Sequence, residues 1–186
     1  MLLNIIIKIE IVIIILLLLL NYLCFTNNIV FLLFLKNILC KFGVLDRQNE
    51  ILNNLWLGDY NASKNIKFIT QKNICLIVNI SKDLSFLKTD RTQKIRIAIN
   101  DDKSSISNKI LVTEFENIYD IVKKNIENKK GVLIHCNQGV QRSAAFVVLF
   151  LMKYKNFSNK QSIKFIKTKS PTIFYNGCNF KESLSL

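Results

Sequence analysis

The sequence predicts an α/β fold in which a central, mostly parallel sheet is flanked by helices in a single domain. Two short, nearly continuous apolar runs, Ile74–Ile80 and Gly131–His135, are typical of strands buried on both faces. Between them, Ser107–Asn128 carries apolar residues at the helical period. A third run, Lys94–Ile99, alternates apolar and polar residues as a strand does. Strands that alternate with helices indicate a layered α/β structure.

The segments before this central part predict one strand and one helix. Ile51–Gly58 is expected to form a short strand with its turn, and Ala62–Lys72 has apolar residues at helical spacing. For the long helix over residues 107–128, Ser107 or Asn108 is the expected N-cap.

The C-terminal part predicts three helices. Arg142–Tyr154 is strongly apolar with helical periodicity, and Asn159–Lys169 is amphipathic. Pro171, the single proline of the chain, should stop the second of these helices. Phe180–Leu186 predicts a last short helix.

Residues 1–45 form a hydrophobic leader that differs from the rest of the chain. Residues 11–35 carry no charge, and 11–20 are wholly aliphatic, which is long enough with its continuation to span a bilayer of roughly 30 Å. Polar residues interrupt the run near its middle, and its aliphatic block also suits a signal peptide. Three interpretations stay open: a membrane anchor, a signal, and an unselected leader translated from AT-rich sequence.

The cysteines and flanking charges bear on the compartment. The five cysteines are an odd number without a CxxC pair, so neither a disulfide framework nor a structural zinc site is indicated, and a reducing compartment is expected. If the leader is an anchor, Lys36 and Lys41 follow it directly, whereas Glu10 offsets Lys8, which places the catalytic part in the cytosol.

Residues 46–186 are strongly basic, with 23 lysines and arginines against 12 aspartates and glutamates. Such a surface favours anionic partners, which include phosphoproteins, nucleic acid and anionic membranes. Scattered lysines on solvated faces explain the same composition, so charge alone selects no partner.

The segment VLIHCNQGVQRSAA joins the end of a buried strand to the start of a helix through the loop Cys136–Gln141. Backbone N–H groups of such a loop and the positive end of the helix point to one centre, where they bind phosphate oxygens. Gly139 permits the tight turn. The same field stabilises a thiolate at Cys136 and makes it nucleophilic. Arg142 offers a planar guanidinium that holds two phosphoryl oxygens and stabilises the transition state.

Cys136, Gly139 and Arg142 satisfy a C-x5-R signature, which His135 and Ser143 extend to HCxxGxxRS. This pattern resembles the dual-specificity protein phosphatases, which are cysteine-dependent phosphoric monoester hydrolases. The motifs LWLGDYNAS, VNIS and IAINDD also occur in that family's order and spacing. The resemblance therefore implies the cysteine-phosphatase fold, a protein tyrosine and serine/threonine phosphatase activity, and no metal or other cofactor.

The resemblance covers about three quarters of the chain, from Ile51 to about Leu184. It implies two parts, a leader over residues 1–45 and a catalytic domain over residues 46–186. The stretch NDDKSSIS most resembles poxviral members of the family, which implies a viral source, a homodimer, and a site of action in the virion or the host cytosol.

The resemblance also implies the role of each site residue. Cys136 attacks phosphorus to form a cysteinyl-phosphate, and Arg142 binds the phosphoryl group. Ser143 donates a hydrogen bond to the thiolate as it leaves, and His135 orients the loop and tunes the thiolate. The residues that bind the substrate phosphate are then Asn137, Gln138, Gly139, Val140, Gln141 and Arg142.

The reaction also needs a general acid for the leaving oxygen, and an aspartate on a loop above the phosphate site suits that role. Asp101 follows the strand KIRIAI, as the family's acid does, about 35 residues before Cys136. Its neighbour Asp102 is the alternative.

Two positions depart from the family's pattern without removing a catalytic group: Gln141 stands where serine is commoner, and Ser170 replaces an arginine before Pro171. The chain lacks the added recognition loop of tyrosine-only phosphatases, so a shallow pocket for phosphotyrosine, phosphoserine and phosphothreonine is expected.

The alternatives are an RNA 5′-phosphatase or a phosphoinositide phosphatase with the same chemistry, and a non-catalytic phospho-binding module. The absence of lysine between Cys136 and Arg142 disfavours lipids, and the residues that flank Arg142 disfavour RNA.

Overall fold

The computed structural model describes residues 10–15, 18, 38–40, 47–88, 91–175 and 177–185. The chain divides into two compact units, Met1–Asp46 and Arg47–Leu186. In the first unit, residues 10–15 and 38–40 are helical. Among the residues that the structure describes, no helix has the length and apolar character needed to cross a bilayer. Most of the predicted membrane segment, residues 11–35, lies outside the described residues.

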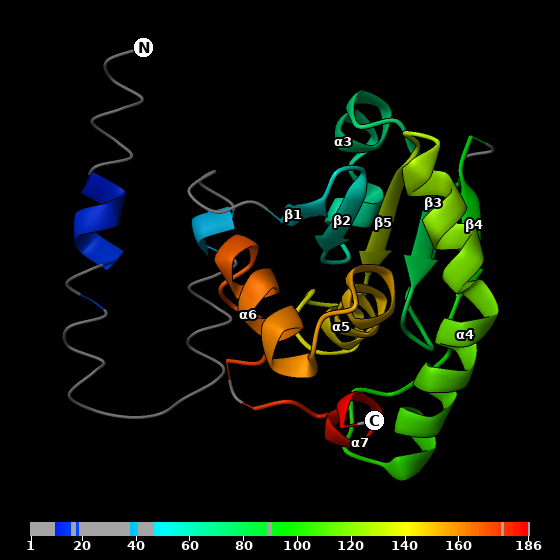
Figure 1. Cartoon of the computed structure of the whole chain (residues 1–186). Coiled ribbons are helices and arrows are strands. Elements are labelled where there is room, and N and C mark those ends of the chain that lie inside the picture. The colour runs from blue at the N-terminus through cyan, green and yellow to red at the C-terminus, as the bar shows by residue number, and fades with distance from the viewer. Residues whose placement is uncertain are drawn as a thin grey trace. The chain divides into compact units, whose positions relative to one another are not determined.

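The second unit is built on a five-stranded sheet with the order β1-β2-β5-β3-β4 (Figure 1). Only the β1–β2 pair is antiparallel, and the other three pairs are parallel. The predicted mostly parallel sheet is therefore confirmed. The strands are β1 (Gln48–Leu52), β2 (Leu55–Gly58), β3 (Ile74–Asn79), β4 (Gln93–Arg96) and β5 (Gly131–His135).

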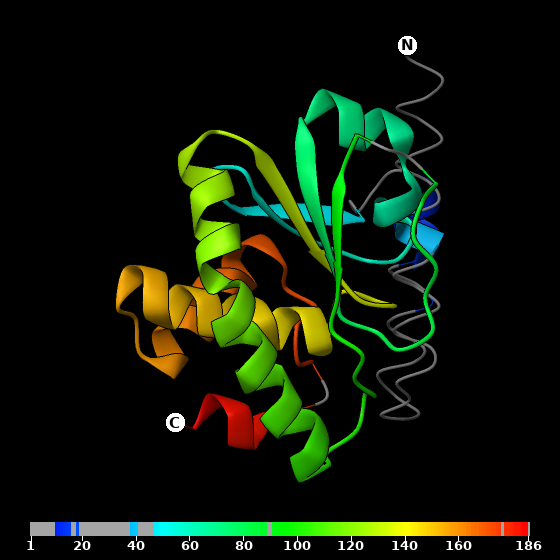
Figure 2. The same cartoon turned by 90° about the vertical axis from the view of Figure 1, so that its right-hand side faces the viewer.

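Alternating side chains of the central strands fill a separate core on each face of the sheet. Leu55, Leu57 and their counterparts on β3 and β5 face the larger core, whereas Trp56, Ile77 and Leu133 face the smaller one. Figure 2 shows α4, α5 and α6 on the side of the larger core and α3 on the other side. The helices are η1 (Ala62–Lys64), α3 (Ile66–Gln71), α4 (Ser105–Glu127), α5 (Arg142–Lys155), α6 (Asn159–Lys169) and α7 (Lys181–Leu184).

The segment Ile51–Gly58, predicted as a short strand with its turn, is most of an antiparallel hairpin. The hairpin turns at Asn53 and Asn54, and Asn54 has a φ of 68°, a left-handed conformation that asparagine adopts more readily than most residues. Its N–H donates to Glu50 Oε1 at 3.0 Å. The predicted strand and turn are present, but the other strand of the hairpin, β1, was missed because it has no apolar run of its own.

The helix predicted over Ala62–Lys72 is interrupted at Asn65, which separates η1 from α3. Asn65 has an extended backbone, and its side chain accepts a hydrogen bond from the N–H of Phe68 at 3.1 Å. Asparagine caps a helix in this way because its side chain replaces a missing backbone acceptor. The periodicity of Ile66 and Ile69 therefore belonged to a shorter helix than expected.

The long helix α4 begins earlier than predicted. Its N-cap is Ser104, whose hydroxyl accepts from the N–H of Ser107 at 3.2 Å, whereas Ser107 and Asn108 lie inside the helix. The strand predicted over Lys94–Ile99 ends at Arg96, although Ile97 and Ile99 are still buried. Buried side chains therefore continue beyond the last residue of β4 that pairs with β3. The alternating pattern alone did not show where the strand pairing ends.

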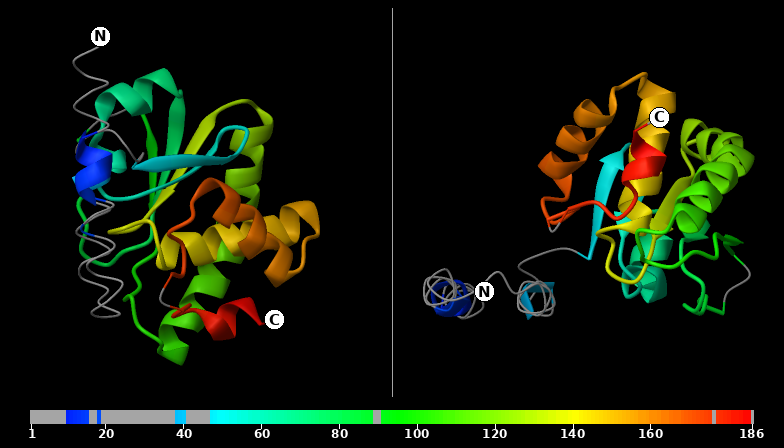
Figure 3. Two further views of the ribbon diagram at one scale, coloured as in Figure 1. Left: turned by 90° about the vertical axis from the view of Figure 1, so that its left-hand side faces the viewer. Right: turned by 90° about the horizontal axis from the view of Figure 1, so that it is seen from below.

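The C-terminal part brings the chain back to the beginning of α5. Helix α6 ends at Lys169, before Pro171, as predicted. The following segment contacts the loop before α5, because the N–H of Phe174 donates to the carbonyl of Val140 at 3.2 Å. Helix α7 packs beside α4 and α5 (Figure 3). The predicted last helix exists but is shorter than Phe180–Leu186 among the described residues.

Candidate active site

The loop between β5 and α5 places Cys136 at the N-terminus of α5. All of β5 is buried, and Cys136 itself is 1% exposed. Its Sγ accepts a hydrogen bond from the N–H of Gly139 at 3.3 Å and another from Ser143 Oγ at 3.2 Å. Both donors point at the atom that would attack phosphorus in the predicted reaction. The predicted partners Gly139 and Ser143 thus lie directly beside the predicted nucleophile.

Neighbouring strand ends hold this loop in its tight conformation. Gly139 has a φ of 70°, and a Cβ at this position would lie 2.7 Å from the carbonyl oxygen of Gly58. The N–H of Tyr60 donates to the carbonyl of Asn137 at 3.1 Å, and Ile80 N–H donates to the carbonyl of His135 at 2.8 Å. The loop is therefore fixed by backbone contacts with the segments that follow β2 and β3.

Arg142 and Asp101 lie together on the other side of the loop. Arg142 is 9% exposed, and its Nε lies 3.3 Å from Asp101 Oδ2. One terminal nitrogen of the guanidinium donates to the carbonyl of Ile99 at 3.5 Å. The side chain of Asp101 is 34% exposed, so its carboxylate sits at the open side of the site. A phosphoryl group held by Arg142 would therefore lie within reach of Asp101.

Asp102 has a different, structural environment. Its Oδ1 accepts hydrogen bonds from the N–H and the hydroxyl of Ser104 at 3.1 and 2.7 Å. The hydrogen bond from the Ser104 side chain is the main cause that lowers the pKa of Asp102. Because Ser104 is the N-cap of α4, Asp102 helps to start that helix, and Asp101 is the aspartate that pairs with Arg142.

His135 is fully buried, and its Nδ1 lies 3.3 Å from the carbonyl oxygen of Cys136. Burial lowers the pKa of His135 to about 4, and positive charges on Lys64, Arg96 and Arg142 act in the same direction. The imidazole is therefore neutral at neutral pH. It contacts the backbone of Cys136, which suits the predicted role of orienting the loop.

The structure also brings in residues that the sequence did not identify. The side chain of Gln141 bonds to Gly177 and Asn179 in the C-terminal segment, and the Asn179 amide bonds to Asp101. Gln141 stood out as a departure from the family's pattern, but nothing in the sequence indicated Asn179. Within the described ranges, no three His, Cys, Asp or Glu side chains gather closely enough to hold a metal ion.

Residues 55–186 match the family described as dual specificity phosphatase, catalytic domain. "Putative tyrosine phosphatase 123R" of invertebrate iridescent virus 6 is 28% identical over 134 residues, which is 72% of this chain and 87% of that protein. Human dual specificity protein phosphatase 16 is 31% identical over 127 residues, 67% of this chain but 18% of the human protein. The crystal structure of human DUSP28 matches with a TM-score of 0.68 and 19% identity, over 76% of this chain and 92% of that one. The chain belongs to the dual specificity phosphatase family.

Proposed function

We propose that this chain hydrolyses phosphotyrosine, phosphoserine and phosphothreonine in proteins through a cysteinyl-phosphate on Cys136. The observation that carries the proposal is the pair of hydrogen-bond donors, from Gly139 and Ser143, on a buried sulfur at a helix N-terminus. Membership of a family of protein phosphatases supports the same reaction. Arg142, which begins the helix after the loop and pairs with Asp101, supplies the group that binds a phosphoryl dianion.

In the first step, Cys136 Sγ attacks phosphorus, the S–P bond forms, and the P–O bond to the substrate breaks. Asp101 transfers its proton to the leaving oxygen, and Arg142 binds two equatorial oxygens of the phosphoryl group. In the second step, water attacks phosphorus while Asp101 takes the water proton, and the S–P bond breaks. The Ser143 hydroxyl, 3.2 Å from the sulfur, stabilises the thiolate that leaves.

Protein substrates are favoured over lipids by the composition of the loop. Between Cys136 and Arg142 the chain has asparagine, glutamine, glycine and valine but no lysine or arginine. A polyanionic inositol headgroup would gain most from further positive charges in this loop. A phosphorylated peptide carries one phosphate to the site and needs only the Arg142 guanidinium and the backbone donors.

The domain boundary and the partners are part of the proposal. The division of the chain after Asp46 supports a catalytic domain over residues 46–186. We expect this fragment to be soluble when expressed alone, and aggregation or unfolding would contradict the boundary.

Membrane association through residues 1–45 and a homodimer stay predictions, which fractionation of cells and sedimentation of the full chain would test. Action in a reducing compartment such as the cytosol fits the essential thiol.

The test is phosphate release by the full chain, in chelator and reductant, from four substrates: a phosphotyrosine peptide, a phosphothreonine peptide, a phosphoinositide, and 5′-triphosphorylated RNA. Cys136→Ser is the matched control. We expect the parent chain to release phosphate from both peptides and Cys136→Ser to release it from neither. Release only from lipid or RNA would keep the chemistry but overturn the substrate class, and no release from any of the four would favour a binding module.

A further inference from the structure

The C-terminal segment Gly177–Asn179 links the phosphate-binding loop to Asp101. Gln141 Nε2 donates to the carbonyl of Gly177 at 2.8 Å, and Gln141 Oε1 accepts from the N–H of Asn179 at 3.1 Å. The Asn179 side chain then donates from Nδ2 to Asp101 Oδ1 at 3.0 Å. One glutamine on the loop therefore fixes the asparagine that holds the carboxylate.

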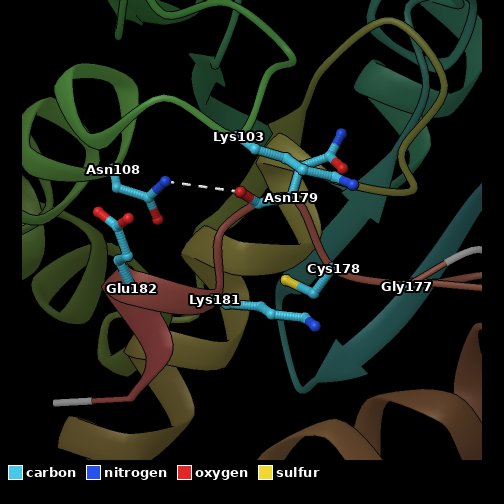
Figure 4. A pocket seen from close by; sticks show the side chains of 7 residues that line it. All are labelled: Lys103, Asn108, Gly177, Cys178, Asn179, Lys181 and Glu182. Carbon is cyan, nitrogen blue, oxygen red and sulfur yellow. Dashed lines mark hydrogen bonds between the residues drawn. The ribbon is translucent and has the colours of Figure 1, made fainter.

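Helix α4 anchors the same segment from the opposite side. Asn108 is 3% exposed, and its Nδ2 donates to the carbonyl of Ser104 at 3.0 Å and to that of Asn179 at 3.5 Å. Its Oδ1 accepts from the N–H and the hydroxyl of Ser183 at 3.0 and 2.7 Å. Figure 4 shows the side chain of Asn108 pointing at the backbone carbonyl of Asn179. Both residues line a pocket of about 320 Å³. The backbone of Asn179 is thus held at both sides, which limits where its amide can point.

These contacts assign different tasks to the two oxygens of Asp101. Oδ1 accepts the amide hydrogen of Asn179, whereas Oδ2 lies 3.3 Å from Arg142 Nε. The hydrogen bond from Asn179 therefore occupies Oδ1 and restricts the rotation of the carboxyl group. Oδ2 is also the oxygen on the side of Arg142, where the phosphoryl group binds.

We propose that Asn179 is a positioning residue, which directs Oδ2 of Asp101 toward the phosphate, and that Gln141 keeps Asn179 in place. The proposal rests on the proposed role of Asp101 as the general acid. It also explains why glutamine is useful before Arg142 in this chain. Its side chain is long enough, and carries both a donor and an acceptor, to bind two backbone groups of the C-terminal segment.

The experiment compares a phosphate ester that needs an acid with one that does not. Phenyl phosphate has a poor leaving group, so its cleavage depends on protonation, whereas dinitrophenyl phosphate departs as a stable anion. The quantity compared is kcat/KM, which reports phosphoryl transfer to Cys136 and not the later hydrolysis step that both esters share. For full-length Asn179→Ala we expect kcat/KM to fall about tenfold on phenyl phosphate, a part of the roughly 100-fold or larger effect of general acid catalysis. On dinitrophenyl phosphate we expect a fall of less than about twofold, because the nucleophile and Arg142 are unchanged.

Three further variants decide how the result is interpreted. Lys181→Ala alters an exposed side chain of the same region and should leave both rates unchanged. Gln141→Ala should reproduce the pattern of Asn179→Ala more weakly, and the double variant should lose less than the product of the two effects, because both act through one contact. Equal losses on both esters for Asn179→Ala would show a merely structural role and overturn the proposal.

Asp101→Asn in the same assay separates this inference from the proposed function. If Asp101→Asn loses activity selectively on phenyl phosphate but Asn179→Ala does not, the positioning role is wrong and the acid stands. If Asp101→Asn loses no more on phenyl phosphate than on dinitrophenyl phosphate, the assignment of Asp101 as the acid fails, and the positioning role fails with it.

Discussion

The phosphate-binding loop, Cys136–Gln141, and the acid loop, residues 100–104, face the same site but are held in different ways. In the phosphate-binding loop Cys136, Gly139 and Val140 are buried, and the loop is fixed largely by backbone contacts, with Gly139 against the carbonyl of Gly58. The acid loop is mostly exposed or half-buried, and the side chains of Arg142 and Asn179 hold the carboxylate of Asp101, the proposed acid. The proposed nucleophile is therefore preorganised by the fold, whereas the proposed acid depends on a few polar contacts at the surface.

This difference predicts how each half responds to mutation. Backbone donors in a water-excluded loop stabilise charge without reorganising, so changes there should remove the chemistry or the fold itself. Contacts at a half-exposed side chain are individually worth little, so changes there should reduce the rate in steps. The following variants test that contrast from the largest expected effect to the smallest.

The largest loss is expected from Cys136→Ser, which should abolish turnover because serine is not ionised at neutral pH. Arg142→Lys should lower kcat by about 10²–10³, since an ammonium does not reproduce the two-oxygen grip of the guanidinium. Steady-state kinetics of the full chain on a phosphotyrosine peptide measures both. Activity of Cys136→Ser within tenfold of the parent chain would remove the cysteine from the mechanism.

Gly139→Ala should inactivate the protein, because a Cβ there meets the Gly58 carbonyl at 2.7 Å in addition to the strain of a positive φ. Gly177→Ala is the matched control, since Gly177 has a φ of 81° but nothing within 4 Å of its added Cβ. The control should be destabilised by about 1–2 kcal/mol, the cost of a left-handed alanine, and stay active. Thermal unfolding and kcat are measured for both, and equal behaviour would contradict the role of the close approach.

Asp101→Ala and Asp102→Ala should separate chemistry from folding. The first should lower kcat on a phosphotyrosine peptide by about 10²–10³ with an unchanged unfolding temperature, because the acid is lost. The second should keep most of the activity but unfold at a lower temperature, since Asp102 supports the N-cap Ser104. The reverse pattern would make Asp102 the acid.

The buried imidazole of His135 predicts a pH dependence of stability. The pKa of His135 is lowered to about 4 by burial, against about 6.5 when unfolded, so between these values the unfolded chain binds more protons. Stability should therefore fall as the pH drops from about 6.5 toward 4, by about 2–4 kcal/mol in total. Urea unfolding at about pH 7, 6 and 5 measures the slope. His135→Gln should lose the part of this pH dependence that comes from His135. An unchanged slope in the variant would contradict the account.

The sequence predicted those parts of the molecule in which local pattern and tertiary structure agree. Strands β3 and β5 are buried on both faces, so their apolar runs were visible, and the strand, loop and helix around Cys136 follow in one continuous stretch. The order of the strands was not readable, because β2 pairs with β5 across more than 70 residues of sequence.

What could not be predicted depends on short polar contacts. A pair of asparagines makes the β1–β2 turn, Asn65 ends η1, and Ser104 starts α4. At these places the apolar pattern had predicted other boundaries for the helices and strands. Likewise, the amide of Asn179 reaches Asp101 from 78 residues away. Side-chain hydrogen bonds of this kind leave no periodic signal.

The central claim is that Cys136 forms a covalent bond to phosphorus, and trapping the intermediate tests it most directly. The full chain is mixed with a phosphotyrosine peptide, quenched in acid within milliseconds, digested, and analysed by mass spectrometry. The account predicts one phosphoryl group on the peptide that contains Cys136, and none after the same treatment of Cys136→Ser. Turnover without any phosphoryl group on that peptide, or with one on another residue, would contradict it.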